Sequence, residues 1–81
     1  MEILTTATGR EINCDYFNYF QPQKRISLRV IGISESEARL IFENPAETAQ
    51  LWCAGQYIAN HTNLKAIIPE GNAIRIVLEQ A

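Results

Sequence analysis

Near the end of the chain, two runs of alternating apolar and polar residues flank a Pro-Glu-Gly-Asn sequence. The runs cover residues 64–68 and 73–79, and in the second run Ile74, Ile76 and Leu78 share one parity. A period of two is the spacing of a β-strand with one buried face. Proline, glycine and asparagine between two such runs favour a turn at residues 69–72. The sequence therefore predicts an antiparallel hairpin here.

Strand-like runs separated by turn residues also fill the first part of the chain. β-Branched, aromatic and other apolar residues predict strands at 2–7, 10–20 and 25–33, and a shorter one at 56–59. Gly9 marks a turn between the first two runs, because glycine adopts the positive φ that such turns require. Pro22 ends the second run, because proline lacks a ladder donor. In the third run the apolar parity changes after Val30, which indicates either a bulge near Val30–Ile31 or burial of both faces.

The middle of the chain carries two helix-start signals. Ser34 and Glu37 have the spacing of a capping box, which predicts a helix at about 35–41, although residues 40–42 could equally form a short strand. Asn44 followed by Pro45 predicts a second start, and we expect a helix at about 45–53.

These elements predict one domain, residues 1–81, of the mainly β (α+β) class. Antiparallel hairpins would form a small roll, sandwich or barrel, with one or two short helices near 35–53. A chain of 81 residues can bury one modest core. We expect that core to include Ile3, Ile12, Tyr16, Ile26, Leu28, Val30, Phe42, Leu51, Trp52, Leu64, Ile74, Ile76 and Leu78.

Charge and hydropathy argue against two classes of partner. The net charge is −2 and the isoelectric point is about 5.2, and only Lys24, Arg25 and Arg29 lie close together among the basic residues. Because nucleic-acid binders usually carry a basic stripe, we expect no nucleic-acid partner. No apolar run approaches the roughly 20 residues that span a bilayer, so we expect no membrane partner. The first residues do not resemble a secretory leader, and we expect a cytoplasmic protein.

Residues able to perform chemistry are few. Cys14, Cys53 and His61 are too few and too scattered for a structural zinc site, which needs four ligands with paired local spacing. A Cys53–His61 dyad is the sharpest enzymatic hypothesis, but the neighbouring Trp52 suggests that Cys53 is a buried thiol. The acidic residues between Glu35 and Glu47 read as a solvated helical face. We therefore expect no enzyme, no cofactor and no metal.

Aromatic residues crowd the second predicted strand and point to both of its faces. If Ile12, Cys14, Tyr16 and Phe20 face the core, then Phe17 and Tyr19 face away from it. Ile67 and Val77 lie on the outward parity of the last hairpin in the same way. Such an apolar second face is rarely exposed in a monomer. Either a closed fold covers both faces, or Phe17, Tyr19, Ile67 and Val77 form an interface with another chain.

Four segments carry a resemblance to a known group of proteins. They are an opening hairpin with Gly9-Arg10-Glu11, the strand leading into Ser34-Glu35-Ser36-Glu37-Ala38, the segment Ile41-Phe42-Glu43-Asn44-Pro45, and the closing run Gly71-Asn72-Ala73-Ile74-Arg75. In these features the chain resembles short uncharacterised proteins of phages and prophages of Gram-positive bacteria, encoded in the tail or head–tail structural region.

The resemblance implies a virion or assembly component that contacts copies of itself or other phage structural proteins. It implies a location in the bacterial host cytoplasm or in the virion, and it supplies no catalytic residues. A small cytoplasmic β-rich binding module for a host protein or ligand is the alternative. Self-association with rising concentration would favour the structural role, and a strict monomer would favour the binding module.

Overall fold

The computed structural model describes residues 2–80, apart from the side chain of Tyr16, and these residues form one seven-stranded antiparallel sheet. Its strand order is β5-β4-β1-β2-β3-β7-β6. The strands are β1 (Glu2–Thr6), β2 (Glu11–Phe20), β3 (Arg25–Ile31), β4 (Gln50–Cys53), β5 (Gln56–Asn60), β6 (Thr62–Glu70) and β7 (Ala73–Gln80). The helices are a 3₁₀ turn η1 (Gln21–Gln23), α1 (Glu35–Phe42) and α2 (Pro45–Thr48). The mainly β class with short helices is confirmed.

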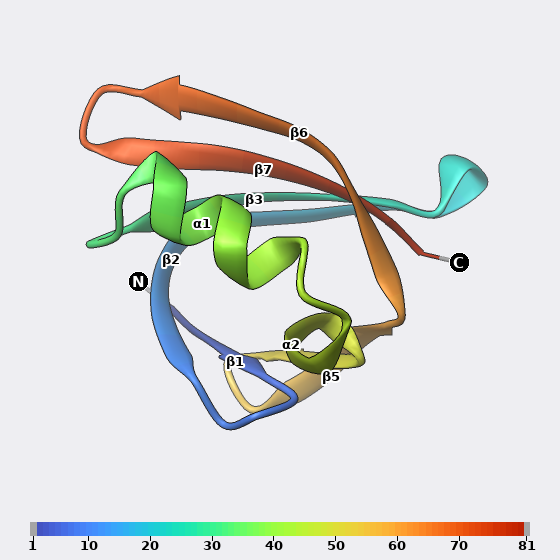
Figure 1. Ribbon diagram of the computed structural model, residues 1–81. Helices are drawn as coiled ribbons and strands as arrows, with labels where there is room; N and C mark the ends of the chain where they lie inside the picture. Colours follow the sequence, from blue (N-terminus) through green and yellow to red (C-terminus); the bar gives the residue numbers. More distant parts are fainter. Residues whose placement is uncertain (1, 81) are drawn as a thin grey trace.

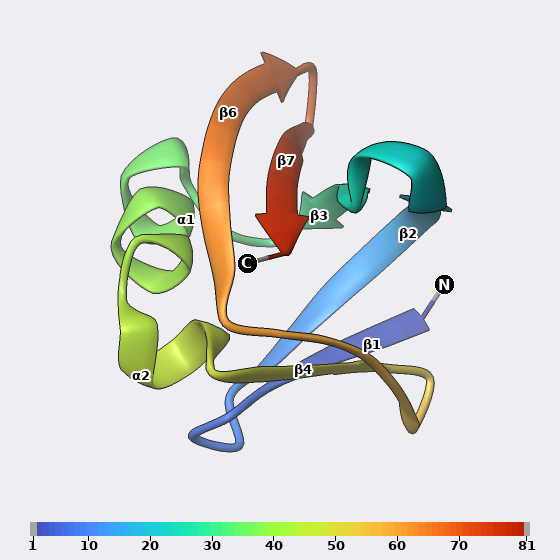
Figure 2. The ribbon, with the colours of Figure 1, turned by 90° about the vertical axis from the view of Figure 1, so that its right-hand side faces the viewer.

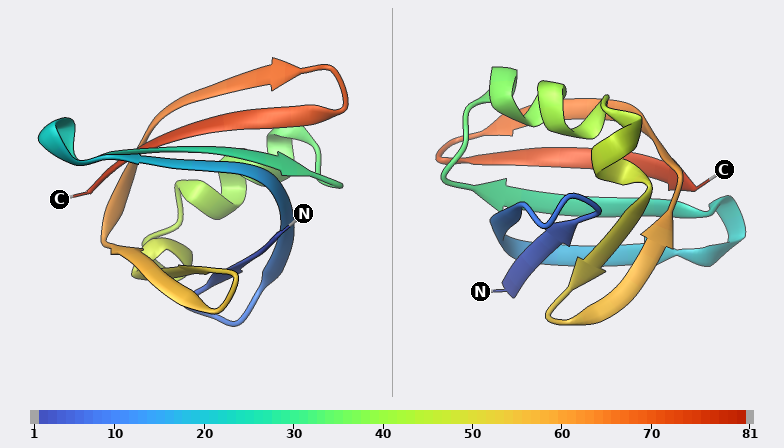
Figure 3. Two further views of the ribbon diagram at one scale, coloured as in Figure 1. Left: turned by 180° about the vertical axis from the view of Figure 1, so that it is seen from behind. Right: turned by 60° about the horizontal axis from the view of Figure 1, so that its bottom comes forward.

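The sheet is open but strongly curled, so that it forms a roll (Figure 1). The two edge strands of the sheet, β5 and β6, are joined in the chain by His61 alone, which adopts a φ of 50°. Figure 3 shows this continuous segment running from the part of the sheet that contains β4 and β1 to the part that contains β3 and β7. The helices lie on the concave side, where α1 and α2 both contact β6. A second packed sheet is therefore unnecessary to bury the concave face.

The helix-start signals are confirmed, but the second helix is shorter than expected. Ser34 Oγ accepts a hydrogen bond from the Glu37 N–H at 3.1 Å, and the Glu37 carboxylate accepts one from the Ser34 N–H at 3.3 Å. Asn44 Oδ1 caps α2 by accepting from the Ala46 N–H. The expectation of a helix over residues 45–53 is wrong beyond Thr48, because Gln50–Cys53 pairs with β1 and β5. Pairing in the sheet outweighs the helical start signal there.

The core lies between the concave face of the sheet and α1. Ile26, Leu28, Val30, Ile76 and Leu78 are fully buried there. Most expected core residues are confirmed, and α1 adds Ala38 and Ile41, which the sequence had not singled out. Three expected members are not buried: Ile3 is 40% exposed, and Trp52 and Leu64 are half-buried. Register places Ile3 and Trp52 on the convex face, whereas Leu64 packs against the core. The expected burial of Tyr16 lies outside the described side chains.

A bulge at Asp15 interrupts the pairing of β2 with β3. Cys14 pairs with Val30, but Tyr16 pairs with Arg29, so Asp15 is the extra residue. The extra residue reverses the side-chain parity, since paired residues share a face. Phe17 therefore shares the concave face with Leu28. The strict alternation expected for residues 10–20, with Phe20 on the core face, is wrong for this reason. The bulge considered near Val30–Ile31 is not there, because β3 pairs with β7 in unbroken register.

The last hairpin has its own irregularity and a tighter turn than expected. Lys65 is the extra residue of a bulge in β6, since Leu64 pairs with Leu78 and Ala66 with Val77. The strand continues through Pro69 to Glu70, so the turn covers fewer residues than 69–72. Proline is accommodated because β6 is an edge strand.

Candidate functional site

The second half of β2 forms an exposed edge of the sheet, because β1 does not extend alongside it. β1 pairs with β2 only from Glu11 to Cys14, whereas β3 pairs with β2 as far as Phe20. Among the described residues, the main chain of residues 16–20 therefore has a strand partner on one side only. Figure 2 shows β2 continuing past β1 towards η1. We call residues 16–20 the β2 edge segment.

The β2 edge segment is aromatic and uncharged. Its sequence is Tyr-Phe-Asn-Tyr-Phe, and the exposed fractions are 36% for Phe17, 37% for Tyr19 and 53% for Phe20. Register places Phe17 and Tyr19 on the concave face beside Leu28 and Ile26. Phe20 lies on the convex face, where it lines an open hollow of about 370 Å³ together with Asn18, Gln23, Arg25, Ser27 and Val77. Apolar side chains thus flank the free main chain on both faces.

The residues predicted as an interface do not share one face. Phe17 and Tyr19 lie on the concave face, next to the core, and Ile67 packs against the core. Val77 lies on the convex face, opposite Ser27 of β3. The expectation that all four lie on one outward face is wrong, because the bulges at Asp15 and Lys65 each shift the parity of a strand. Their role in an interface remains a prediction.

Sequence reasoning missed Asn18 and Phe20 as parts of this edge, although a signal was present. The first predicted strand, residues 2–7, is far shorter than the second, residues 10–20. In a hairpin a short strand can cover only part of a longer one. The uncovered part is the aromatic run between Asp15 and Pro22.

The other two edges of the sheet are protected. β5 is short and has Ile58 as an extra residue opposite β4, since Leu51 pairs with Ala59 and Trp52 with Tyr57. β6 contains the bulge at Lys65 and has Pro69 near its end. Lysine, proline, bulges and short length each hinder pairing with a further strand. The β2 edge segment is also short and follows the bulge at Asp15, but it contains no lysine or proline, and its exposed side chains are aromatic.

Ion pairs hold the start of the β2 edge segment in place. Asp15 Oδ1 accepts a hydrogen bond from Arg29 Nε at 2.8 Å, and this bond lowers the pKa of the Asp15 carboxyl. On the same convex face, Glu70 accepts from Arg75 Nε at 2.9 Å, which lowers the pKa of Glu70. Glu70 also lies 3.9 Å from Arg29. The two carboxylates therefore offset the like-charge repulsion between Arg29 and Arg75, which are directly paired across β3 and β7.

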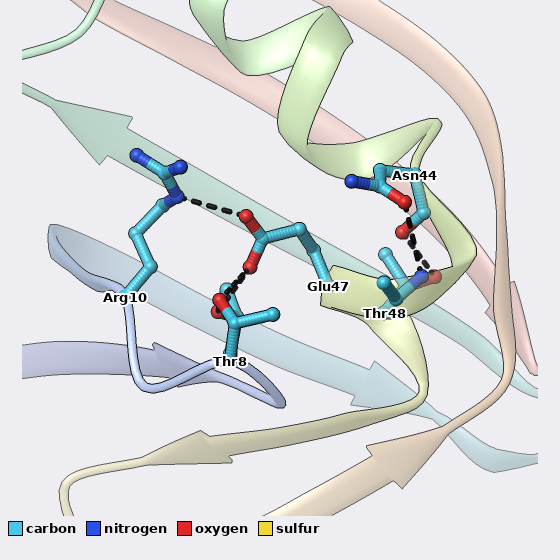
Figure 4. A network of polar contacts seen from close by, with 7 residues as sticks. Thr8, Arg10, Asn44, Glu47 and Thr48 are labelled. Atoms are coloured by element: carbon cyan, nitrogen blue, oxygen red, sulfur yellow. Dashed lines mark hydrogen bonds and ion pairs between the residues drawn. The ribbon is translucent and has the colours of Figure 1, made fainter.

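A buried carboxylate fastens α2 to the β1–β2 turn (Figure 4). Glu47 is only 5% exposed, and its Oε1 accepts hydrogen bonds from Thr6 Oγ1 at 2.6 Å and from Thr8 Oγ1. Its Oε2 accepts from Arg10 Nε at 3.0 Å. The two threonine bonds, and then Arg10, lower the pKa of Glu47 despite its burial. The reading of Glu47 as part of a solvated face is wrong, because tertiary partners satisfy its charge.

The structure does not bring Cys53 and His61 together. Cys53 pairs with Gln56 at the turn end of the β4–β5 hairpin, and His61 follows Asn60 at the opposite end. At about 3.3 Å per residue the two ends lie roughly 10 Å apart. Burial raises the pKa of the Cys53 thiol, whereas an activated thiolate needs a lowered pKa.

A groove of about 770 Å³ runs between the helices and the first half of β6. His61 to Ile67 form one wall, and Arg39, Phe42, Glu43, Pro45 and Thr48 form the other. Thr62 is 5% exposed, and its Oγ1 has no hydrogen-bond partner among the residues that the structure describes. Within residues 2–80, no three His, Cys, Asp or Glu side chains gather as metal ligands would. No helix in that part of the chain has the length and apolarity required to cross a bilayer.

Comparisons of the chain with protein-family models, with curated proteins and with solved structures find no match.

Proposed function

We propose that the protein is a non-enzymatic structural or assembly protein of phage origin that acts through protein–protein contacts. The observation that supports the proposal is the β2 edge segment. An exposed apolar strand with free N–H and C=O groups is a template for pairing with another protein chain. Because the edges formed by β5 and β6 are protected, the β2 edge segment is the edge most available for pairing with another chain.

The proposal also draws on the kind of side chain at that edge. Phe17, Tyr19 and Phe20 remain between 36% and 53% exposed, although each is large and apolar. Aromatic residues are enriched at the centres of protein interfaces, where they bury much area at little entropic cost. The partners are further copies of the protein or neighbouring phage structural proteins.

The test is incorporation into particles. A phage or prophage that carries the gene is induced, particles are purified, and the protein is quantified by mass spectrometry. We expect the wild-type protein in the particles, and we expect the double variant Phe17→Glu, Phe20→Glu to be depleted at least tenfold. Leu40→Glu is the control, because Leu40 is 74% exposed on α1, away from the edge. Absence of the wild-type protein from particles overturns the proposal.

The groove beside β6 favours a second candidate, a binding module for a host protein or small ligand. The unpartnered Thr62 hydroxyl is the specific observation, because a buried hydroxyl usually has a hydrogen-bond partner. Under this function the protein stays monomeric and titration shifts NMR signals at residues 61–67. A protein found in particles with no such response excludes this candidate.

A further inference from the structure

We infer that the first partner of the β2 edge segment is the same segment of a second copy, paired antiparallel about Asn18. This inference rests on the proposed function, since it names one partner for the same surface. The paired segments would join two curled sheets into one continuous sheet across a two-fold axis.

The absence of charge makes the segment compatible with itself. Residues 16–20 carry no ionisable acid or base at neutral pH, and the nearest acid, Asp15, is paired with Arg29 at 2.8 Å. The chain as a whole carries a net charge of −2, so two copies repel each other weakly at other surfaces. An uncharged edge is therefore where two identical chains can approach at low electrostatic cost.

Register follows from the ends of the segment. The bulge at Asp15 precedes it and the 3₁₀ turn at Gln21 follows it, so pairing cannot extend beyond either end. Two identical antiparallel segments that pair along their full length have their two-fold axis at the middle residue, which is Asn18. Asn18 then lies opposite Asn18 of the second copy.

This register also matches the aromatic side chains. With Asn18 at the axis, Phe17 of each copy lies opposite Tyr19 of the other, and both residues are on the concave face. Directly opposed aromatic pairs stabilise antiparallel strands. Each of these side chains is more than a third exposed in the single chain, so each has area to bury. An isologous contact of this kind closes on itself as a dimer.

The first experiment uses charge reversal at the axis. The purified chain is measured by light scattering on a sizing column across a wide concentration range, and a dimer is expected. Asn18→Lys or Asn18→Asp alone places two like charges opposite each other, so we expect at least a tenfold weaker dimer for each variant. An equimolar mixture of the two should restore dimer formation as a heterodimer, which also shows that both variants are folded.

The second experiment is cross-linking at the same position. Asn18→Cys should form an intermolecular disulfide under mild oxidation, because directly opposed strand residues bring their Cβ atoms within about 5.5 Å. Leu40→Cys is the control, since Leu40 is also exposed but lies on α1.

Three outcomes overturn the inference. They are a wild-type chain that is monomeric throughout the concentration range, Lys and Asp variants that dimerise as tightly as the wild type, or equal cross-linking of Asn18→Cys and Leu40→Cys. A strict monomer that is still incorporated into particles would refute the second copy as partner and leave the proposed function standing.

Discussion

Glu47 shows how one buried charge can be built into so small a core. Three side chains donate hydrogen bonds to its carboxylate, and the Ala7 N–H donates to its main-chain carbonyl at 3.0 Å. A charge with that many donors is stable without water. The residue therefore connects α2 with the β1–β2 turn, two elements far apart in the chain.

Replacing Glu47 by glutamine should lower the free energy of unfolding at neutral pH by about 2 kcal/mol, because hydrogen bonds to a charged acceptor are weakened. The folded-state pKa of Glu47 is lowered relative to its ordinary value of 4.5. Its stabilisation is therefore complete above that value and is lost as the pH falls through the folded-state pKa.

Urea denaturation of both proteins between neutral and acidic pH checks this prediction. The difference in unfolding free energy between wild type and Glu47→Gln should shrink as the pH falls. Glu43→Gln is the matched control, because Glu43 is exposed and pairs only with Arg39 among the contacts described. A difference that stays constant with pH would contradict the role of the Glu47 charge.

Among the elements, α1 is the one whose stability depends most directly on the cap at its first turn. A helix spanning only Glu35–Phe42 is marginal without a cap and tertiary contacts. Ser34→Ala removes the acceptor for the Glu37 N–H and should lower the free energy of unfolding by about 1 kcal/mol. Thermal unfolding followed by circular dichroism measures the loss, with Ser36→Ala as the control within the helix. Equal losses in the two variants would argue against the cap.

The extent to which the sequence predicts these elements depends on how local their signals are. The capping box, the strand runs and the antiparallel hairpins depend on neighbouring residues, and they are confirmed. The bulges at Asp15 and Lys65 depend on partner strands, and no local pattern marks them. Because one extra residue reverses every later side chain of its strand, Phe17, Tyr19 and Ile67 were assigned to the wrong face, whereas Val77 does face away from the core. The helix expected at 45–53 is shorter for a similar reason, because Gln50–Cys53 forms a strand that pairs with neighbouring strands.

At the scale of the whole molecule, the distribution of protected edges determines what kind of assembly can form. A chain with one free edge can pair once, whereas a chain with two free edges can extend indefinitely. β6 is kept from pairing in part by Pro69, which has no N–H to donate. If the β2 edge segment is the edge that pairs, as inferred above, this distribution of edges favours a closed dimer.

Replacing Pro69 by valine should restore an edge donor on β6 and shift the protein towards species larger than a dimer at high concentration. Light scattering across a concentration series measures this shift. Pro45→Val is the matched control, because Pro45 lies in α2 outside the sheet. A Pro69→Val protein with the same mass distribution as the wild type would mean that Pro69 does not protect the edge.

The single extra residue at Asp15 also has a consequence for how this chain can diversify. On one side of it, Ile12 and Cys14 are buried and tied to folding; on the other, residues 17–20 are exposed and pair with β3 alone. One strand is thereby divided into a half under stability constraint and a half open to variation. Mutations could exchange binding specificity in the second half while the first half keeps the fold intact, so new recognition could evolve without redesign of the scaffold.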